Sequence, residues 1–199
     1  MWALKLGGSI LHLSAEDPLA AARDLLFERL RALPGRFLLV PGGGRHAEAV
    51  RAAQQVEGFD EDTAHTQALV AMDRCAGELA ELLGVGARVL ARLADAPRLA
   101  ATGVTPVWAP HADLAADHTL PRSWGLSSDS IAAVAARRLG LPGVVLLKAC
   151  DTPPDASAER LAAAGVVDSE WPRQVAGLPW RVMGPADWAA ALALRGPRG

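Results

Sequence analysis

The sequence predicts an α/β fold, a three-layer αβα sandwich around a mainly parallel central sheet. Short, continuous apolar runs alternate along the chain with segments of helical periodicity. Strands that are apolar throughout are typical of parallel sheets, whose two faces are both covered by helices. Several of these runs end at glycines, which is where a strand turns into the following helix.

Strand-like runs and helical patterns follow one another through the first half of the chain. Residues 2–6 are expected to form a strand that leads into Gly7-Gly8. Apolar side chains recur every three or four positions over residues 16–33, which predicts a helix that Pro34-Gly35 ends. The elements expected next are a strand at 36–40, helices at about 47–56 and 63–83, and strands at 87–91 and 104–108.

The second half continues the alternation after a polar loop at residues 110–124. Ser127-Ser128 opens a helix that ends near Leu139-Gly140, and residues 143–148 form another continuous apolar strand. In parallel sheets of this kind, ligands bind outside the carboxyl ends of the strands. The remaining expected elements are a proline-rich loop at 151–155, short helices near 157–164 and 169–176, a strand at 179–183 and a last helix at 185–195.

Length and composition narrow the class of protein. We expect 199 residues to form one domain, covering 1–199. A formal charge of −2 argues against nucleic-acid binding, which needs a basic face. Each apolar run is interrupted before the roughly 20 residues of a membrane span, and no secretory signal is seen. Cys75 and Cys150 are expected to be buried free thiols of a reducing compartment. We therefore expect a cytoplasmic protein with no nucleic-acid or membrane partner.

The chain contains only two lysines, Lys5 and Lys148, against eighteen arginines. Each stands at the end of an expected strand, and Lys5 lies just before Gly7-Gly8. An ammonium is a compact point charge on a flexible stem, whereas a guanidinium is a wide planar fork. Two lysines retained at strand ends indicate a site for phosphate oxygens. The alternative is chance placement in an arginine-biased composition.

Two glycine-rich segments follow strands at the same edge of the expected sheet. The backbone of Gly7-Gly8-Ser9 can approach an anion closely, and the serine can add a hydroxyl contact, although a plain turn has the same pattern. Gly42-Gly43-Gly44 precedes a helix, whose free amides and positive dipole end favour an anion. Arg45 and His46 are candidates for holding an acidic acceptor, although a lone histidine is more often a surface or capping residue. Neither segment has a P-loop or a dinucleotide-binding pattern.

Ser127-Ser128-Asp129-Ser130 opens a helix, where Ser and Asp are favoured as caps. Capping and the helix dipole account for part of this cluster. The functional interpretation, which depends mainly on the family resemblance given below, is that Asp129 orients one or both lysines, since a carboxylate between two ammonium groups keeps both of them charged and in position.

Four potential ligands gather in the loop at 110–124, but their spacing matches no zinc signature, so a solvated loop is the preferred interpretation and any metal ligands are left unassigned. They are His111, Asp113, Asp117 and His118.

Taken together, these residues resemble the amino acid kinase family, which includes aspartate, acetylglutamate, carbamate and uridylate kinases. Residues 126–133, Leu147-Lys148 and 165–168, together with the short chain, most resemble a small kinase branch of methanofuran biosynthesis. That branch converts 5-(aminomethyl)-3-furanmethyl phosphate to its diphosphate. Four segments that span most of the chain carry the family resemblance in the family's order: Lys5-Leu6-Gly7-Gly8-Ser9, Val40-Pro41-Gly42-Gly43-Gly44, Ser128-Asp129-Ser130-Ile131-Ala132-Ala133 and Leu146-Leu147-Lys148-Ala149-Cys150-Asp151.

The resemblance implies an enzyme, an ATP-dependent kinase that uses Mg²⁺ and a small phosphate or carboxylate acceptor, in a homo-oligomer. It implies that Lys5 neutralises charge on the transferring phosphoryl group and that Asp129 orients the lysines. The other implied contacts are Gly7, Gly8 and Ser9 to the β- and γ-phosphates, Lys148 and Asp151 on the nucleotide side, and Gly42, Gly43, Gly44, Arg45 and His46 to the acceptor.

The chain also departs from the family pattern. Residues 149–153 replace the usual Val-Asp-Gly after the strand, and no lysine follows Lys148, so Lys148 or an arginine such as Arg173 would have to take that role. Two other functions stay open. One is formation of an acyl phosphate on an amino acid such as aspartate. The other is non-catalytic nucleotide or oxyanion binding by a storage or regulatory protein on the same fold.

Overall fold

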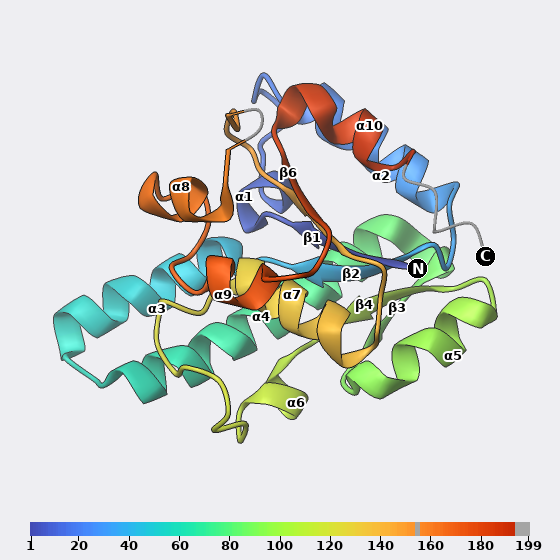
Figure 1. Ribbon diagram of the computed structural model, residues 1–199. Coiled ribbons are helices and arrows are strands. Elements are labelled where there is room, and N and C mark those ends of the chain that lie inside the picture. Colours follow the sequence, from blue (N-terminus) through green and yellow to red (C-terminus); the bar gives the residue numbers. More distant parts are fainter. Residues whose placement is uncertain (154–155, 194–199) are drawn as a thin grey trace.

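A computed structural model describes residues 1–153 and 156–193. Its six strands form one sheet with the order β3-β4-β2-β1-β5-β6, and every neighbouring pair is parallel (Figure 1). The predicted α/β fold with a parallel central sheet is therefore confirmed. The strands are β1 (Trp2–Leu6), β2 (Phe37–Pro41), β3 (Ala87–Leu90), β4 (Thr105–Trp108), β5 (Val144–Leu147) and β6 (Trp180–Met183).

Strand β1 lies in the middle of the sheet, between β2 and β5. Its Lys5 is in register with Val40 of β2 and with Leu146 of β5. The hydrogen-bond ladder between β1 and β5 continues past the end of β1, because Gly7 N–H donates to the Leu147 carbonyl at 3.1 Å. The carboxyl ends of these three strands therefore meet at one edge, where both glycine-rich segments begin.

Most helices lie where the sequence predicts them. The helix expected at 16–33 begins only at Ala20, because the Asp17 carboxylate accepts from Leu19 N–H at 2.9 Å and forms a turn ahead of it. The loop at 110–124 contains one short helix, and residues 194–195 of the expected last helix lie outside the described residues. The helices are α1 (Gly8–Leu11), α2 (Ala20–Arg31), α3 (Gly44–Glu57), α4 (Glu61–Leu83), α5 (Ala96–Ala101), α6 (His111–Leu114), α7 (Ser128–Arg138), α8 (Ala158–Ala163), α9 (Trp171–Val175) and α10 (Trp188–Ala191), with 3₁₀ turns at Gly84–Gly86, Leu93–Asp95 and Pro185–Asp187.

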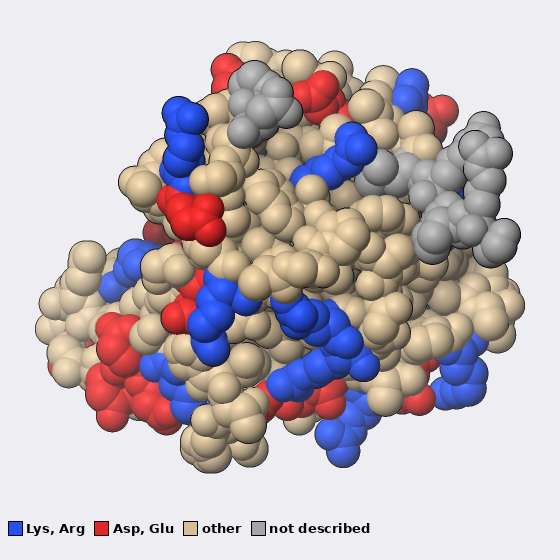
Figure 2. Space-filling view, in the orientation of Figure 1, with Lys and Arg blue, Asp and Glu red and all other residues tan. Residues whose placement is uncertain are grey.

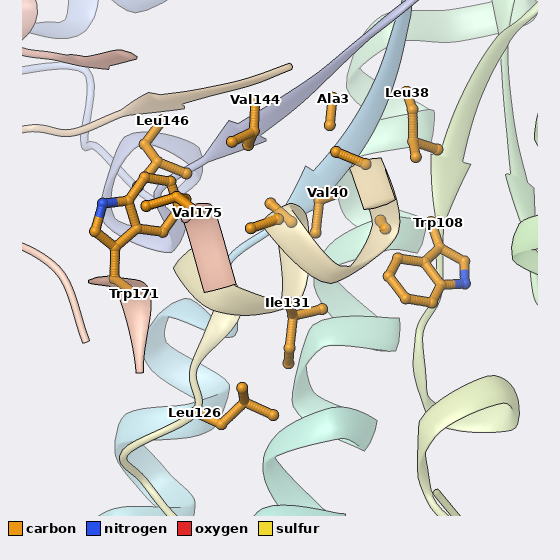
Figure 3. Packing of buried hydrophobic residues seen from close by; sticks show 14 of the residues in the cluster. Ala3, Leu38, Val40, Trp108, Leu126, Ile131, Val144, Leu146, Trp171 and Val175 are labelled. Carbon is orange, nitrogen blue, oxygen red and sulfur yellow. The ribbon is translucent and has the colours of Figure 1, made fainter. Parts of the chain in front are cut away.

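Each face of the sheet is covered by its own apolar core. Alternate strand residues such as Leu38, Val40 and Leu146 pack against α7 and α9, as Figure 3 shows around Ile131 and Trp171. The opposite strand faces pack against α2 and α10, which lie together on the other side in Figure 1. Helix α4 contributes side chains to both cores, so it packs against the helices on both sides of the sheet.

The surface agrees with the near-neutral charge. On the face shown in Figure 2, acidic and basic side chains are interspersed among neutral ones. None of the described helices is both long and apolar enough to cross a membrane. Cys75 is a buried free thiol as expected, but the expectation for Cys150 is wrong: it is exposed, because it lies beyond the end of β5.

Replacing Leu39 by Ala should destabilise the fold by about 2–5 kcal/mol, because the side chain is fully buried in the middle of the sheet and its loss leaves a cavity. Urea unfolding measures the change. Val85→Ala is the control, since Val85 is fully exposed. Equal effects of the two substitutions would contradict the described packing.

Candidate functional site

The two lysines of the chain converge on one carboxylate. Lys5 Nζ lies 2.8 Å from Asp129 Oδ1, and Lys148 Nζ donates a hydrogen bond to Asp129 Oδ2 at 2.6 Å. Lys5 comes from β1, Lys148 follows the neighbouring β5, and Asp129 stands in the first turn of α7. The side chains of Lys5 and Asp129 are only 6% and 5% exposed, and that of Lys148 is 14% exposed. The structure thus brings Asp129 into contact with both lysines.

Burial and neighbouring charges shift the pKa values of Asp129 and Lys148. Burial alone would raise the pKa of Asp129, but the ammonium groups of Lys5 and Lys148 outweigh it and hold that pKa below its usual value. Burial, followed by repulsion from Lys5, lowers the pKa of Lys148. With both lysines charged, the cluster carries one positive charge in excess. A buried excess charge is costly unless a partner compensates it, so the cluster favours an anionic ligand.

Asp168 holds the start of α7 in place. Its Oδ2 accepts from Ser127 N–H at 2.9 Å, Ser127 Oγ–H at 2.8 Å and Ser130 N–H at 3.0 Å, and its Oδ1 accepts from Ser130 Oγ–H at 2.5 Å. Burial raises the pKa of Asp168, and the nearby Asp129 charge adds to the effect. An acid from a distant segment thus caps the helix that presents Asp129, so the serines serve as cap donors rather than as cap acceptors.

The two glycine segments touch backbone to backbone. A Cβ added at Gly8 would lie 2.1 Å from Gly44 N, and one at Gly42 would lie 2.6 Å from Gly8 N. Gly44 also has a φ of +50°, which side chains rarely permit. A plain turn does not require such contact, so these glycines are needed for the close approach of the two loops.

Several amides of these loops have no acceptor. Among the described residues, the N–H groups of Gly8, Ser9, Gly43 and Gly44 make no hydrogen bond. The last two lie at the amino end of α3, where the helix dipole is positive. Free amides beside two ammonium groups form a surface suited to phosphate or carboxylate oxygens.

A cavity of about 540 Å³ opens beside the glycine loops. Its apolar wall includes Leu69 and Met72 of α4, and Arg51 lies over the Trp124 ring with 4.0 Å between its Cζ and the ring centroid. Arg45 also lines the cavity. A small molecule with an apolar body and an anionic group fits this lining by its chemistry.

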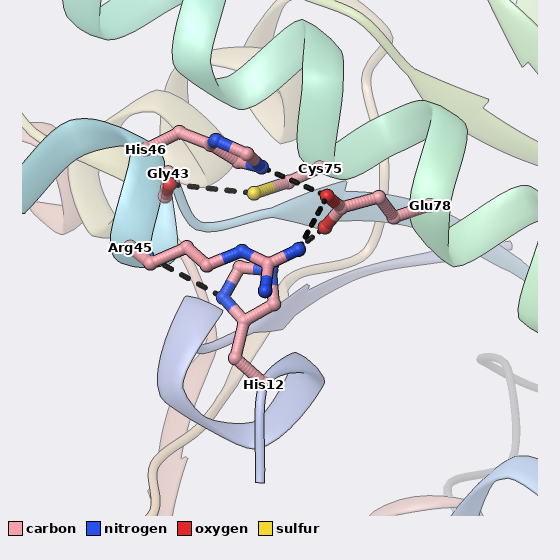
Figure 4. A network of polar contacts seen from close by, with 6 residues as sticks. All are labelled: His12, Gly43, Arg45, His46, Cys75 and Glu78. Carbon is pink, nitrogen blue, oxygen red and sulfur yellow. Dashed lines mark hydrogen bonds and ion pairs between the residues drawn. The ribbon is translucent and has the colours of Figure 1, made fainter. Parts of the chain in front are cut away.

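A second polar cluster ties the glycine loops to α4 (Figure 4). Glu78 lies 2.7 Å from His12 Nε2 and 2.8 Å from His46 Nε2, and Arg45 Nη2 donates to it at 3.2 Å. Burial would raise the pKa of Glu78, but hydrogen bonds from these three residues lower it to about 2. Cys75 Sγ–H donates to the Gly43 carbonyl at 3.3 Å, and burial raises the pKa of this thiol to about 12. The thiol is therefore protonated and poorly nucleophilic as it stands.

The structure brings most of the candidate residues to one edge and leaves a few outside it. Arg45 and His46 lie at that edge but are paired with Glu78. Asp151 is exposed, and Arg173 is paired with Glu170 at 2.6 Å. Two acidic residues of the loop at 110–124 make structural contacts. Asp113 accepts hydrogen bonds from Leu93 N–H at 2.6 Å and from Trp108 Nε1–H at 3.2 Å. Asp117 forms an ion pair with Arg138. Within the described residues, this loop forms no cluster suited to a metal.

Asp168, His12 and Glu78 had no predicted role, although Asp168 lies in the 165–168 segment that carries part of the resemblance. All three act on residues far away in the chain, such as the 66-residue separation between His12 and Glu78. For Glu78 the available signal was its spacing from Cys75, because residues three apart on a helix share a face.

Comparisons with known proteins identify the fold. No family description and no curated protein matches this sequence. The solved uridylate kinase from Archaeoglobus fulgidus superposes with a TM-score of 0.65 at 17% identity, covering 98% of this chain and 97% of that one. The UMP kinase from Bacillus anthracis gives 0.64 at 12% identity, with 96% and 89% covered. Aspartate kinase from Synechocystis gives 0.64 at 15%, with 92% and 37% covered. The chain therefore has an amino acid kinase-like fold.

Gly8→Ala should destabilise the protein by roughly 1–3 kcal/mol, because the added methyl group overlaps the Gly44 backbone and pushes the two loops apart. Chemical denaturation measures it. Gly77→Ala in α4 is the matched control: no atom lies within 4 Å of the added Cβ, so it should stabilise by about 0.5–1 kcal/mol. If Gly8→Ala left the stability unchanged, the two loops would not be in contact.

Asp129→Asn should cost about 3–5 kcal/mol at pH 7, since it leaves two buried ammonium groups without a counter-charge. Because the folded pKa of Asp129 is lowered, its contribution is complete well above the ordinary value of 3.8 and is lost as the pH falls below it. The difference in the free energy of unfolding between wild type and variant should therefore become smaller as the pH is lowered. Asp95→Asn, in an exposed pair with Arg98, should show little change at any pH. A gap that does not depend on pH would contradict the ion pairing.

Proposed function

We propose that this chain is an ATP-dependent phosphotransferase that acts on a small anionic acceptor. The observation that carries the proposal is the buried Lys5–Asp129–Lys148 cluster, with its excess positive charge, beside two loops with free amides. The fold supports it, because ligands of parallel sheets bind at this edge. The kinases with a similar fold give the reaction class by analogy only.

The proposed reaction is in-line transfer of the γ-phosphoryl group. An acceptor oxygen attacks the γ-phosphorus, the bond from that phosphorus to the β,γ-bridging oxygen breaks, and ADP leaves with the electron pair. Lys5 and the amides of Gly8 and Ser9 would stabilise charge on the phosphoryl oxygens, and Lys148 would do so on the nucleotide side. Such catalysis is mostly positioning and electrostatics. An acceptor that is already an anion needs no general base.

Mg²⁺ would reduce the negative charge of the triphosphate. Both oxygens of Asp129 are engaged by the lysines, so this carboxylate is not free to hold the ion. The donors at the site fit phosphate oxygens better than a metal. We therefore expect Mg²⁺ to be held mainly by the nucleotide and by water, as Mg²⁺ sites often are.

The residues that line the cavity limit the size and charge of the acceptor. Trp124 and Met72 would suit a small ring, and Arg51 would suit a phosphate or carboxylate, whereas Arg45 is already paired with Glu78. We propose 5-(aminomethyl)-3-furanmethyl phosphate as the first acceptor to test, since it combines a small ring with a phosphate. Aspartate, which would form an acyl phosphate, offers a carboxylate without a ring.

ADP release from Mg-ATP tests the proposal with the furan phosphate, aspartate, glutamate, carbamate and UMP as acceptors. Lys5→Ala should lower turnover by about 10²–10³-fold, as the loss of an oxyanion-stabilising donor does in other enzymes. Lys5→Arg should not restore it, because the planar guanidinium does not fit a buried pocket built for an ammonium.

Arg98→Ala is the control, since this side chain is 81% exposed and lies in a surface pair. Turnover with aspartate alone would move the assignment to acyl-phosphate formation. Binding of ATP without turnover on any acceptor would favour a storage or regulatory protein. No binding of ATP would exclude a kinase.

A further inference from the structure

Four potential metal ligands of three chemical kinds meet beside the second glycine loop. One ligand atom from each of His12, His46, Cys75 and Glu78 lies within 4.8 Å of all the others. His12 follows α1, His46 is in the first turns of α3, and the other two residues come from one face of α4 (Figure 4). Three separate elements thus supply two imidazoles, a thiol and a carboxylate to one point.

We propose that His12, His46, Cys75 and Glu78 bind a divalent transition metal ion of the zinc type. Imidazole nitrogen, thiolate sulfur and carboxylate oxygen are the protein ligands of zinc, and four of them close a structural site. A thiolate and two imidazoles do not suit Mg²⁺, which prefers oxygen. The proposed ion is therefore a different one from the Mg²⁺ that accompanies ATP.

The geometry needs only small adjustments. Tetrahedral zinc with its usual bond lengths places neighbouring ligand atoms roughly 3.3–3.8 Å apart. The Nε2 atoms of the two histidines now lie 2.7 and 2.8 Å from the Glu78 carboxylate, so these distances would lengthen on metal binding. The longer distances among the four ligand atoms, which reach up to 4.8 Å, would shorten. A hydrogen-bonded network would account for Glu78 and core packing for the burial of Cys75, so the proposal rests on the convergence of all four ligand atoms at one point.

Proton balance follows from the bonds formed. Cys75 would lose its thiol proton to solvent as the metal–sulfur bond forms, and its weak contact with the Gly43 carbonyl would end. His12 and His46 would each bind through Nε2 and carry the remaining ring proton on Nδ1, and His12 Nδ1 now faces Arg45 N–H at the long distance of 3.4 Å. Metal binding would thus release the Arg45 amide at the amino end of α3, beside the cavity.

The metal would fasten the glycine loops to the core. His12 stands at the end of the helix that begins with Gly8, and His46 lies two residues after Gly44. The His12 ring packs on Gly44, where an added Cβ would lie 2.5 Å from Nδ1. An ion bound at this point would hold both loops against α4, and its role would be structural whatever reaction the site performs.

Cobalt substitution tests this proposal without any activity measurement. Tag-free protein is stripped with a chelator and titrated with Co²⁺, whose tetrahedral thiolate complexes absorb strongly. We expect one equivalent to bind with a sulfur-to-cobalt charge-transfer band, Zn²⁺ to displace it, and Zn²⁺ to raise the melting temperature.

Cys75→Ser should abolish the charge-transfer band and weaken binding at least tenfold, and Cys150→Ser is the matched control that should keep both. Glu78→Gln should weaken binding while keeping the band, which covers the case in which Cys75→Ser fails to fold by circular dichroism. The proposal is overturned if the wild type shows no thiolate band, if Cys150→Ser removes it, or if Glu78→Gln binds Co²⁺ as tightly as the wild type.

Discussion

The ion pairs from Asp129 to Lys5 and Lys148 are the constraint on which the rest of the site depends. Three charges can be buried together only if each faces a partner, which requires adjacent strands to end at the same level and a helix to start opposite them. The parallel pairing of β1 with β5 meets the first requirement. Asp168 meets the second by fixing the start of α7 through Ser127 and Ser130.

The close contact between the glycine loops places the proposed phosphate-binding loop after β1 beside the proposed acceptor-binding loop before α3. Because Gly8 and Gly44 have no side chains, the loop after β1 and the amino end of α3 meet, and their free amides border one cavity. The network around Glu78 holds the far side of both loops against α4. The free amides thus border the cavity at the same edge of the sheet as the Lys5–Asp129–Lys148 cluster, whose three residues do not themselves line the cavity.

The strands, the glycine loops and the meeting of the two lysines could be predicted because their signals are local, whereas the place of Asp129 between the lysines rested mainly on the family resemblance. Apolar runs, turns and strand ends lie within a few residues of each other, and parallel pairing then brings Lys5 and Lys148 together. The contributions of Asp168 and of the Glu78 network could not be predicted, since they depend on tertiary contacts between distant segments. Cys150 was misjudged because an apolar run does not show where the strand leaves the sheet.

A crystal structure with Mg²⁺ and a non-hydrolysable ATP analogue would test the central claim most directly. The triphosphate should lie across the ends of β1, β2 and β5, with Lys5 and Lys148 contacting its oxygens and Asp129 still between them. A triphosphate bound elsewhere, with both lysines still paired only to Asp129, would contradict the claim that this buried cluster is an anion site.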